Sequence, residues 1–194
     1  MAHQTGYRTA SFEEQPQSRM QRKKEGREYR RREAKGWVIS LTCAIVLALV
    51  LRFFIFEFIH VDGPSMQPLL WKDQYVFMEK VSYRFNAPMR GDIVVCSFPG
   101  SADTFIKRVI GLPGEIVSIQ DGTLYIDGAP NYDYFEGYIE IGMTQTTVPE
   151  NSVLVMGDNR NDSHDSRAVG PIAYKDILGK ALFVVWPLDS MHGL

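Results

Sequence analysis

An apolar segment near the N-terminus, GWVISLTCAIVLALVLRFFIFEFIH, constrains this chain more than any other feature. Residues 37–51 carry no charge, and the apolar character resumes after Arg52 and continues to Ile59. Since a helix needs about 20 apolar residues to cross a bilayer, the segment 36–59 predicts one membrane-spanning helix. Arg52 then lies near the far interface, where its long side chain reaches water, and Trp37 suits the near interface.

The preceding residues 1–35 are polar, lack clear periodicity and predict a tail. Residues 19–35 contain nine basic residues and three acidic ones. The basic residues are Arg19, Arg22, Lys23, Lys24, Arg27, Arg30, Arg31, Arg32 and Lys35. Such a run is typical of a nucleic-acid-binding arm or of a solvated helix. Beside a membrane span, however, basic residues mark the cytoplasmic side. We therefore expect a cytoplasmic tail, and the net charge of −2 argues against a nucleic-acid partner.

A cleaved secretory signal also combines basic residues with an apolar core. Here the apolar stretch is long, and the bulky sequence FFIFEF stands where a small-x-small cleavage site would follow. The sequence therefore favours an uncleaved single-pass anchor over a cleaved signal or a buried core helix.

The remaining residues, 60–194, predict a mainly β domain. Turn signals such as RGD at 90–92 and LPG at 112–114 separate short runs rich in β-branched and aromatic residues. SIQDGTLYIDG predicts a hairpin around Asp121-Gly122. One helical turn is expected at 174–179, and 127–150 reads as a less regular insertion. The expected strands cover 75–78, 92–96, 106–110, 116–119, 123–126, 152–156 and 182–186.

The two cysteines predict neither a disulfide nor a metal site. Cys43 lies in the apolar segment and Cys96 in an expected strand, so the two are not expected to meet. No metal and no cofactor is expected.

The stretch HVDGPSMQPLL, residues 60–70, raises the question of a nucleophile because it holds one hydroxyl, Ser65. A serine in such a loop commonly caps a helix or closes a turn, and as a nucleophile it needs a base nearby. His60 is one candidate base, and His164 beside Asp165 is another. Adjacent residues of a strand point to opposite faces, which places Asp165 poorly for orienting His164.

Lys107, in TFIKRVIGLPGE, is the other candidate base. A lysine with an ordinary pKa of about 10.4 cannot accept a proton at neutral pH, but burial lowers that pKa by several units. Strand alternation sends Lys107 and Arg108 to opposite faces, so one can enter a dry site. A Lys-Arg pair is also typical of an edge strand that faces solvent. The motif alone therefore does not decide between a buried lysine base and a solvent-facing edge strand.

A third cluster, GDNRNDSHDSRAVG at 157–170, gathers charged and amide side chains among turn formers. Its simplest interpretation is a hydrogen-bonded turn network. A calcium loop is disfavoured because the spacing does not match an EF-hand and two arginines intrude.

Taken together, three motifs behind one apolar segment resemble the type I (leader) signal peptidases of the bacterial plasma membrane, in their Gram-positive-like form with a single N-terminal anchor. They are GPSMQP, RGDIVV with FIKRVIGLPGE, and GDNRNDSHDSR, and the resemblance covers roughly residues 37–187. It implies a mainly β, mostly antiparallel catalytic domain outside the membrane. The implied activity is removal of signal peptides from exported preproteins after Ala-x-Ala sites, with preproteins and the lipid bilayer as partners.

The resemblance also implies roles for individual residues. Ser65 is the expected nucleophile and Lys107 the general base, acting as a neutral amine. The backbone of Ser65 and of Gly63 is expected to hold the oxyanion. The residues expected to support Ser65 and Lys107 are Ser163, which would hydrogen-bond Lys107, Asp165 and Arg167, which would hold that segment, and Asp158, which would pair with Arg108. The expected substrate pocket consists of Val61, Met66, Leu70, Phe105 and Ile106.

The sequence departs from the family pattern in two motifs. Gly63 stands where some members have a Ser or Thr whose hydroxyl completes the oxyanion site. The third motif commonly reads Arg-Asp-Asn-Ser, whereas this chain has Asn161 followed by Asp162, an exchange expected to affect the chemistry little. The short spacing between the second and third motifs also predicts a small accessory insertion, at about 120–148.

Two other functions fit the sequence. A specialised Ser–Lys peptidase would mature one exported or conjugative substrate, and an inactive membrane-tethered β module would use the motif residues only for a turn network. A self-cleaving repressor uses the same pair but needs a DNA-binding domain, which the tail does not resemble. The sequence does not assign an oligomeric state.

Overall fold

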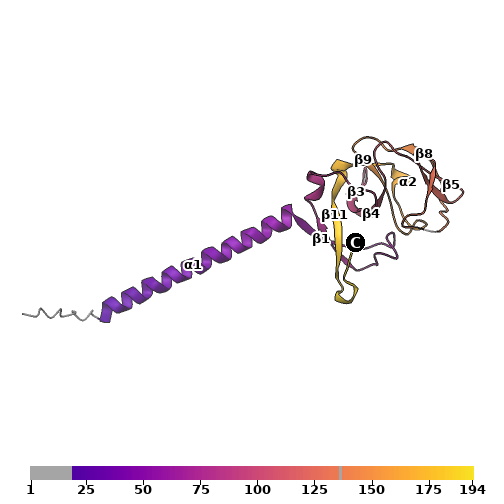
Figure 1. Cartoon of the computed structure of the whole chain (residues 1–194). Helices are drawn as coiled ribbons and strands as arrows, with labels where there is room; N and C mark the ends of the chain where they lie inside the picture. The colour runs from indigo at the N-terminus through magenta and orange to yellow at the C-terminus, as the bar shows by residue number, and fades with distance from the viewer. Residues whose placement is uncertain (1–18, 136) are drawn as a thin grey trace, which may run out of the picture. The chain divides into compact units, whose positions relative to one another are not determined.

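The computed structural model describes residues 19–135 and 137–194, so the first half of the predicted tail lies outside the described residues. The chain divides into two compact units, one ending at Ala48 and the other beginning at Leu49. Helix α1 (Arg19–Phe54) begins in the first unit, and its last residues belong to the second (Figure 1).

Helix α1 differs at both ends from the predicted anchor of 36–59. It begins at Arg19, so the basic part of the tail is helical, and it ends at Phe54. Residues Phe56–His60 instead form strand β1, where Phe58 pairs with Phe77 of the next strand. Periodicity cannot separate an apolar strand from the end of an apolar helix, which is why the helix was predicted to continue to Ile59. The part Arg27–Phe54 is long and apolar enough to cross a membrane.

The second unit is built around an antiparallel sheet in the order β1-β2-β11-β3-β4-β9-β10, with β12 paired to β11. The additional strands are β2 (Tyr75–Glu79), β3 (Ile93–Ser97), β4 (Thr104–Gly111), β9 (Ser152–Met156), β10 (Ile172–Ala173), β11 (Ile177–Trp186) and β12 (His192–Gly193). This confirms the mainly β prediction. Strand β4, which carries Lys107, lies between β3 and β9, so the solvent-facing edge alternative for the Lys-Arg pair is wrong.

A second antiparallel sheet has the order β7-β6-β5-β8. Its strands are β5 (Ile116–Gln120), β6 (Thr123–Ile126), β7 (Ala129–Asn131) and β8 (Met143–Thr147). The predicted hairpin is confirmed, with positive φ at both Asp121 and Gly122 as a tight two-residue turn requires. The predicted irregular insertion was partly wrong, because β7 and β8 pair as the edge strands of this sheet, of which Figure 1 labels β5 and β8.

Short helices complete the unit: η1 (Ser82–Arg84), α2 (Ser166–Val169), η2 (Tyr174–Asp176) and η3 (Leu188–Ser190). The expected helical turn at 174–179 is therefore confined to η2, after which β11 begins.

The apolar core fixes the strand that holds Lys107 from several sides. Ile106 packs in one buried cluster with Val61 and Met66. Val109 belongs to a second cluster, and Ile110 packs in a third that includes residues of the second sheet. Because three clusters meet on β4, its side chains have little freedom to move, and any functional group there is held in place.

Candidate active site

Ser65 lies in the turn that follows β1. The turn is closed by a hydrogen bond from Gln67 N–H to the Pro64 carbonyl (3.0 Å). It is tied to the loop between β9 and α2 (residues 157–165), because Asn159 N–H donates to the Ser65 carbonyl at 3.0 Å. The side-chain amide of Asn159 also donates to the Pro64 carbonyl at 3.3 Å. Local turn bonds and one distant loop together position the hydroxyl.

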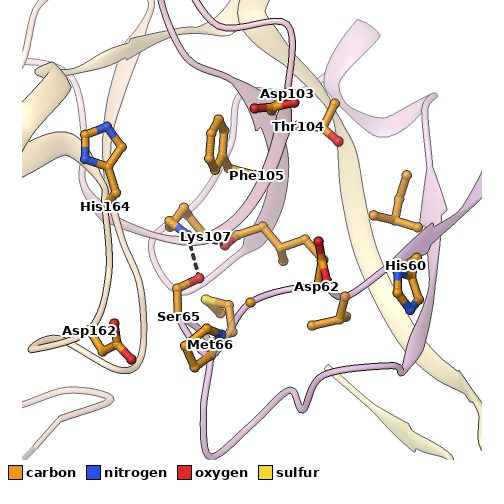
Figure 2. A pocket seen from close by; sticks show the side chains of 15 residues that line it. His60, Asp62, Ser65, Met66, Asp103, Thr104, Phe105, Lys107, Asp162 and His164 are labelled. Carbon is orange, nitrogen blue, oxygen red and sulfur yellow. Dashed lines mark hydrogen bonds between the residues drawn. The ribbon is translucent and has the colours of Figure 1, made fainter.

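Lys107 meets Ser65 from the middle of β4. Its Nζ donates to Ser65 Oγ at 2.7 Å and to the Ile106 carbonyl at 3.1 Å (Figure 2). Lys107 is 2% exposed, and among the described residues its amine forms no ion pair with a carboxylate. Burial lowers the pKa of this amine below its ordinary value, and the charge of Asp165 opposes the shift in part. A buried lysine in contact with a hydroxyl is the arrangement that activates a serine.

Arg108, the next residue of β4, bonds on the opposite side of the strand. Its guanidinium donates twice to Asp158, with both N–O distances 2.7 Å, and once to the Gly91 carbonyl at 2.9 Å. The two-point pairing fixes the start of the β9–α2 loop against β4. The expected pair of Arg108 and Asp158 is therefore present in the structure.

Asp165 and Arg167 form a second buried pair at the end of the same loop. Arg167 Nε and Nη2 donate to the Asp165 carboxylate, each at 2.8 Å. Asp165 also accepts from Gly157 N–H (3.0 Å) and caps α2. Burial would raise the pKa of Asp165, but hydrogen bonds from Arg167 and Gly157 lower it below its usual range. Asp165 therefore stays ionised and closes the β9–α2 loop.

Ser163 does not make the expected bond to Lys107. Its Oγ is buried and has no hydrogen-bond partner within the described part of the chain. It does lie against Gly157, where an added Cβ would collide with Ser163 Oγ and the Ser65 carbonyl. Gly157 was missed in the sequence, although a glycine directly after a strand can signal close approach of another backbone segment.

A pocket of about 570 Å³ opens beside Ser65 and Lys107. Four of the five predicted pocket residues, Val61, Met66, Phe105 and Ile106, line it together with Gly63. The fifth, Leu70, is fully buried in the core and does not line the pocket, which corrects that prediction. The four apolar side chains form one part of a pocket that also has charged and polar residues, and that apolar part can receive apolar substrate side chains beside Ser65.

Both candidate histidines also line this pocket, but neither contacts Ser65 in the described structure. His164 packs edge-on against Phe98, with ring centroids 5.8 Å apart. His60 lies 3.3 Å from Asp73. The triad alternative fails because Asp165 is engaged by Arg167 and α2 rather than by His164.

Comparison with known proteins decides the family. The model of the family "Signal peptidase, peptidase S26" matches residues 34–186, which is most of the chain. The chain belongs to the signal peptidase family. The earlier resemblance to type I signal peptidases and the prediction of a serine protease are therefore confirmed.

Individual relatives agree with this family. Signal peptidase I of Leptolyngbya laminosa is 38% identical over 80% of this chain and 81% of the relative. A probable signal peptidase I-1 of Synechocystis is 40% identical over 76% of this chain and 80% of the relative. Signal peptidase I T of Bacillus subtilis is 36% identical over 80% of this chain and 87% of the relative. These alignments cover most of each signal peptidase.

Proposed function

We propose that this signal peptidase is a membrane-anchored Ser–Lys endopeptidase that cleaves exported preproteins after small-x-small sites. Removal of signal peptides is the activity of its family. The observation that carries the proposed mechanism is the 2.7 Å contact between Lys107 Nζ and Ser65 Oγ in a buried, apolar setting. The lowered pKa of Lys107 makes its neutral form accessible, which a base requires.

The first half of the reaction acylates the serine. Neutral Lys107 takes the proton from Ser65 Oγ while Oγ attacks the carbonyl carbon of the scissile bond. The oxyanion accepts a hydrogen bond from the Ser65 N–H, which donates to no other described residue. When the tetrahedral intermediate collapses, the C–N bond breaks and protonated Lys107 gives its proton to the leaving amine. The mature protein departs and the signal peptide remains esterified to Ser65.

The second half uses water in the place of the amine. Lys107, neutral again, removes a proton from a water molecule that attacks the ester carbonyl. Collapse of the second intermediate returns the proton to Ser65 Oγ and releases the signal peptide. Asp158, Arg108, Asp165 and Arg167 touch no reacting atom in this scheme; they hold β4 and the β9–α2 loop in register.

The anchor and its orientation are part of the same proposal. α1 contains an apolar stretch long enough to span a bilayer, and the basic residues lie on its N-terminal side. Ser65 follows the end of α1 by eleven residues of sequence (54 to 65). A nucleophile so close to a span is suited to a bond at the outer membrane surface. The proposed location is the bacterial plasma membrane with the catalytic unit outside.

The test compares the full chain with its Lys107→Met variant in detergent. Methionine preserves the apolar stem and removes the amine, so cleavage of an Ala-x-Ala preprotein is expected to fall by about 10³-fold or more while circular dichroism stays unchanged. Ser65→Ala is the matched variant for the nucleophile. Equal cleavage by a folded Lys107→Met protein would rule out this base. Cleavage restricted to one of many preproteins would favour the specialised peptidase.

A further inference from the structure

A second pocket, of about 270 Å³, adjoins the first. It is lined by Ile141, Asn161, Asp162, Ser163, His164, Asp165, Arg167 and Ala168. Asp162 and His164 line both pockets, so these two residues form a shared ridge. A polypeptide that crosses Ser65 and passes over the ridge would enter the second pocket directly.

The ridge lies on one side of the nucleophile. Figure 2 shows Asp162 and His164 on one side of Ser65 and Lys107, and His60 and Asp62 on the other. His60 ends β1, and only Ile55 separates β1 from the end of α1. Because β1 follows the proposed span directly in sequence, we take the signal segment to approach Ser65 from the β1 side. The mature part of the substrate then leaves over the ridge.

The exposed charge of the second pocket is negative. Asp165 and Arg167 neutralise each other, and their side chains are 0% and 3% exposed. Asp162 is exposed, and among the described residues its carboxylate has no ion-pair or hydrogen-bond partner. The lining therefore presents one free carboxylate to whatever occupies it, beside the apolar side chain of Ile141, which is 55% exposed.

The exchange of residues in the third motif explains why this carboxylate is on the ridge. Asn161 uses both ends of its amide: Nδ2 donates to the Tyr138 carbonyl at 2.9 Å, and Oδ1 accepts from Glu140 N–H at 3.0 Å. A carboxylate at 161 could not donate the first of these bonds. With the amide at 161 holding the loop, the acidic residue of the motif stands at 162 and faces the substrate path.

We propose that the second pocket is the subsite for the first residues of the mature protein, and that Asp162 makes it favour a basic side chain over an acidic one. This inference rests on the proposed function, since it assigns the mature side of the same cleavage. It gives the Asn161-Asp162 exchange a role in substrate choice, in place of the small effect expected from sequence.

The test uses the full chain in detergent and preproteins that differ only at the first or second mature residue, which is Lys, Gln or Glu. At low ionic strength, kcat/KM for the Lys substrate is expected to exceed that for the Glu substrate by about 1.4- to 5-fold, the range of exposed charge pairs. The ratio should narrow in high salt because screening weakens exposed charges.

Four variants separate the subsite from general effects. Asp162→Asn should bring the Lys-to-Glu ratio close to one, and Asp162→Glu should keep it above one. Ile141→Lys, which adds the opposite charge to the same pocket, should invert it. Asp103→Asn removes an equal charge from a residue that lines the first pocket alone, and should leave the ratio at its wild-type value.

The outcomes distinguish the two levels of inference. Cleavage of all substrates without a charge preference, or a preference that survives Asp162→Asn, overturns the subsite and leaves the peptidase standing. A wild-type chain that cuts none of the substrates overturns the proposed function and the subsite with it.

Discussion

At the scale of single residues, the proposed mechanism depends on keeping one lysine uncharged. Lys107 is buried on β4 next to Ile106, which packs in an apolar cluster, and the carboxylate of Asp165 is occupied by Arg167. If Asp165 were free, its charge would favour the protonated amine and oppose the desolvation. By pairing with Asp165, the buried Arg167 limits how far the charge of Asp165 raises the pKa of Lys107.

The first prediction concerns pH. The active form of Lys107 is the neutral amine, so kcat/KM should rise with pH and level off above the pKa of Lys107. Because burial lowers that pKa, the midpoint should lie below the ordinary lysine value of 10.5. A pH series of kcat/KM measures it, with circular dichroism at each pH as the control for folding. A rising limb that His164→Gln abolishes would instead assign the titration to histidine.

The second prediction concerns Gly157. An added methyl group would collide with Ser163 Oγ and with the Ser65 carbonyl, so Gly157→Ala must displace the nucleophile's turn. We expect a loss of about 1–3 kcal/mol in the free energy of unfolding, as in other overpacked sites, and a large fall in kcat. Gly193→Ala is the matched control, since its Cβ would meet nothing within 4 Å. Wild-type kcat in Gly157→Ala would show that the turn tolerates displacement.

At the scale of elements, aromatic side chains of the segment between β7 and β8 couple the second sheet to the first sheet and to the β9–α2 loop. The Tyr134 ring lies 4.4 Å from the Arg108 guanidinium carbon, and Phe135 lies 5.2 Å from that of Arg160. Tyr134 also packs against Gly91, where a Cβ would collide with it. The RGD turn therefore has a packing role here, because its glycine makes room for the ring that covers Arg108.

The third prediction tests this coupling. Tyr134→Ala should lower the free energy of unfolding by about 0.5–2 kcal/mol through the lost cation–π contact. It should lower kcat more than it changes KM, because Arg108 and Asp158 position β4 and the β9–α2 loop without touching substrate. Tyr134→Phe keeps the ring and should restore both quantities. Denaturant unfolding and steady-state kinetics measure the two effects, and a change confined to KM would contradict the positioning role.

Sequence patterns predicted the strands whose residues alternate or are strongly apolar. They failed for segments whose secondary structure depends on pairing with a neighbouring strand. Phe56–His60 continues an apolar helix and becomes a strand because it pairs with Tyr75–Glu79. MTQTT in β8 has little apolar signal and is strand because β5 lies beside it. At the site, the motifs indicated Ser65 and Lys107. These two residues are 42 positions apart in the sequence, so no local pattern predicts the 2.7 Å contact between Lys107 Nζ and Ser65 Oγ. The second pocket was likewise invisible, because it forms only where Ile141 approaches the β9–α2 loop.

At the scale of the whole molecule, the length of α1 bears on how the enzyme meets the membrane. A helix of 36 residues is about 54 Å long, whereas the hydrocarbon core of a bilayer is about 30 Å thick. Helix α1 ends at Phe54 within the apolar segment, so its excess length belongs to the basic N-terminal part. In the proposed orientation, its charges lie beside the cytoplasmic leaflet, which is anionic and attracts basic residues.

The last prediction follows from that arrangement. In intact cells stripped of their wall, an added protease should reach the catalytic unit and leave the basic tail intact, because basic flanking residues are retained in the cytoplasm. Replacing Arg30, Arg31, Arg32 and Lys35 by Gln should weaken that retention and produce a mixed population in which some tails are cleaved. The matched control replaces Glu25, Glu28 and Glu33 by Gln, which keeps every basic residue and should preserve one orientation, since acidic residues contribute little to it. If the basic-to-Gln variant stays in one orientation, the catalytic unit rather than the tail determines the topology. The basic residues of the tail would then contact the cytoplasmic leaflet without setting the orientation of the chain.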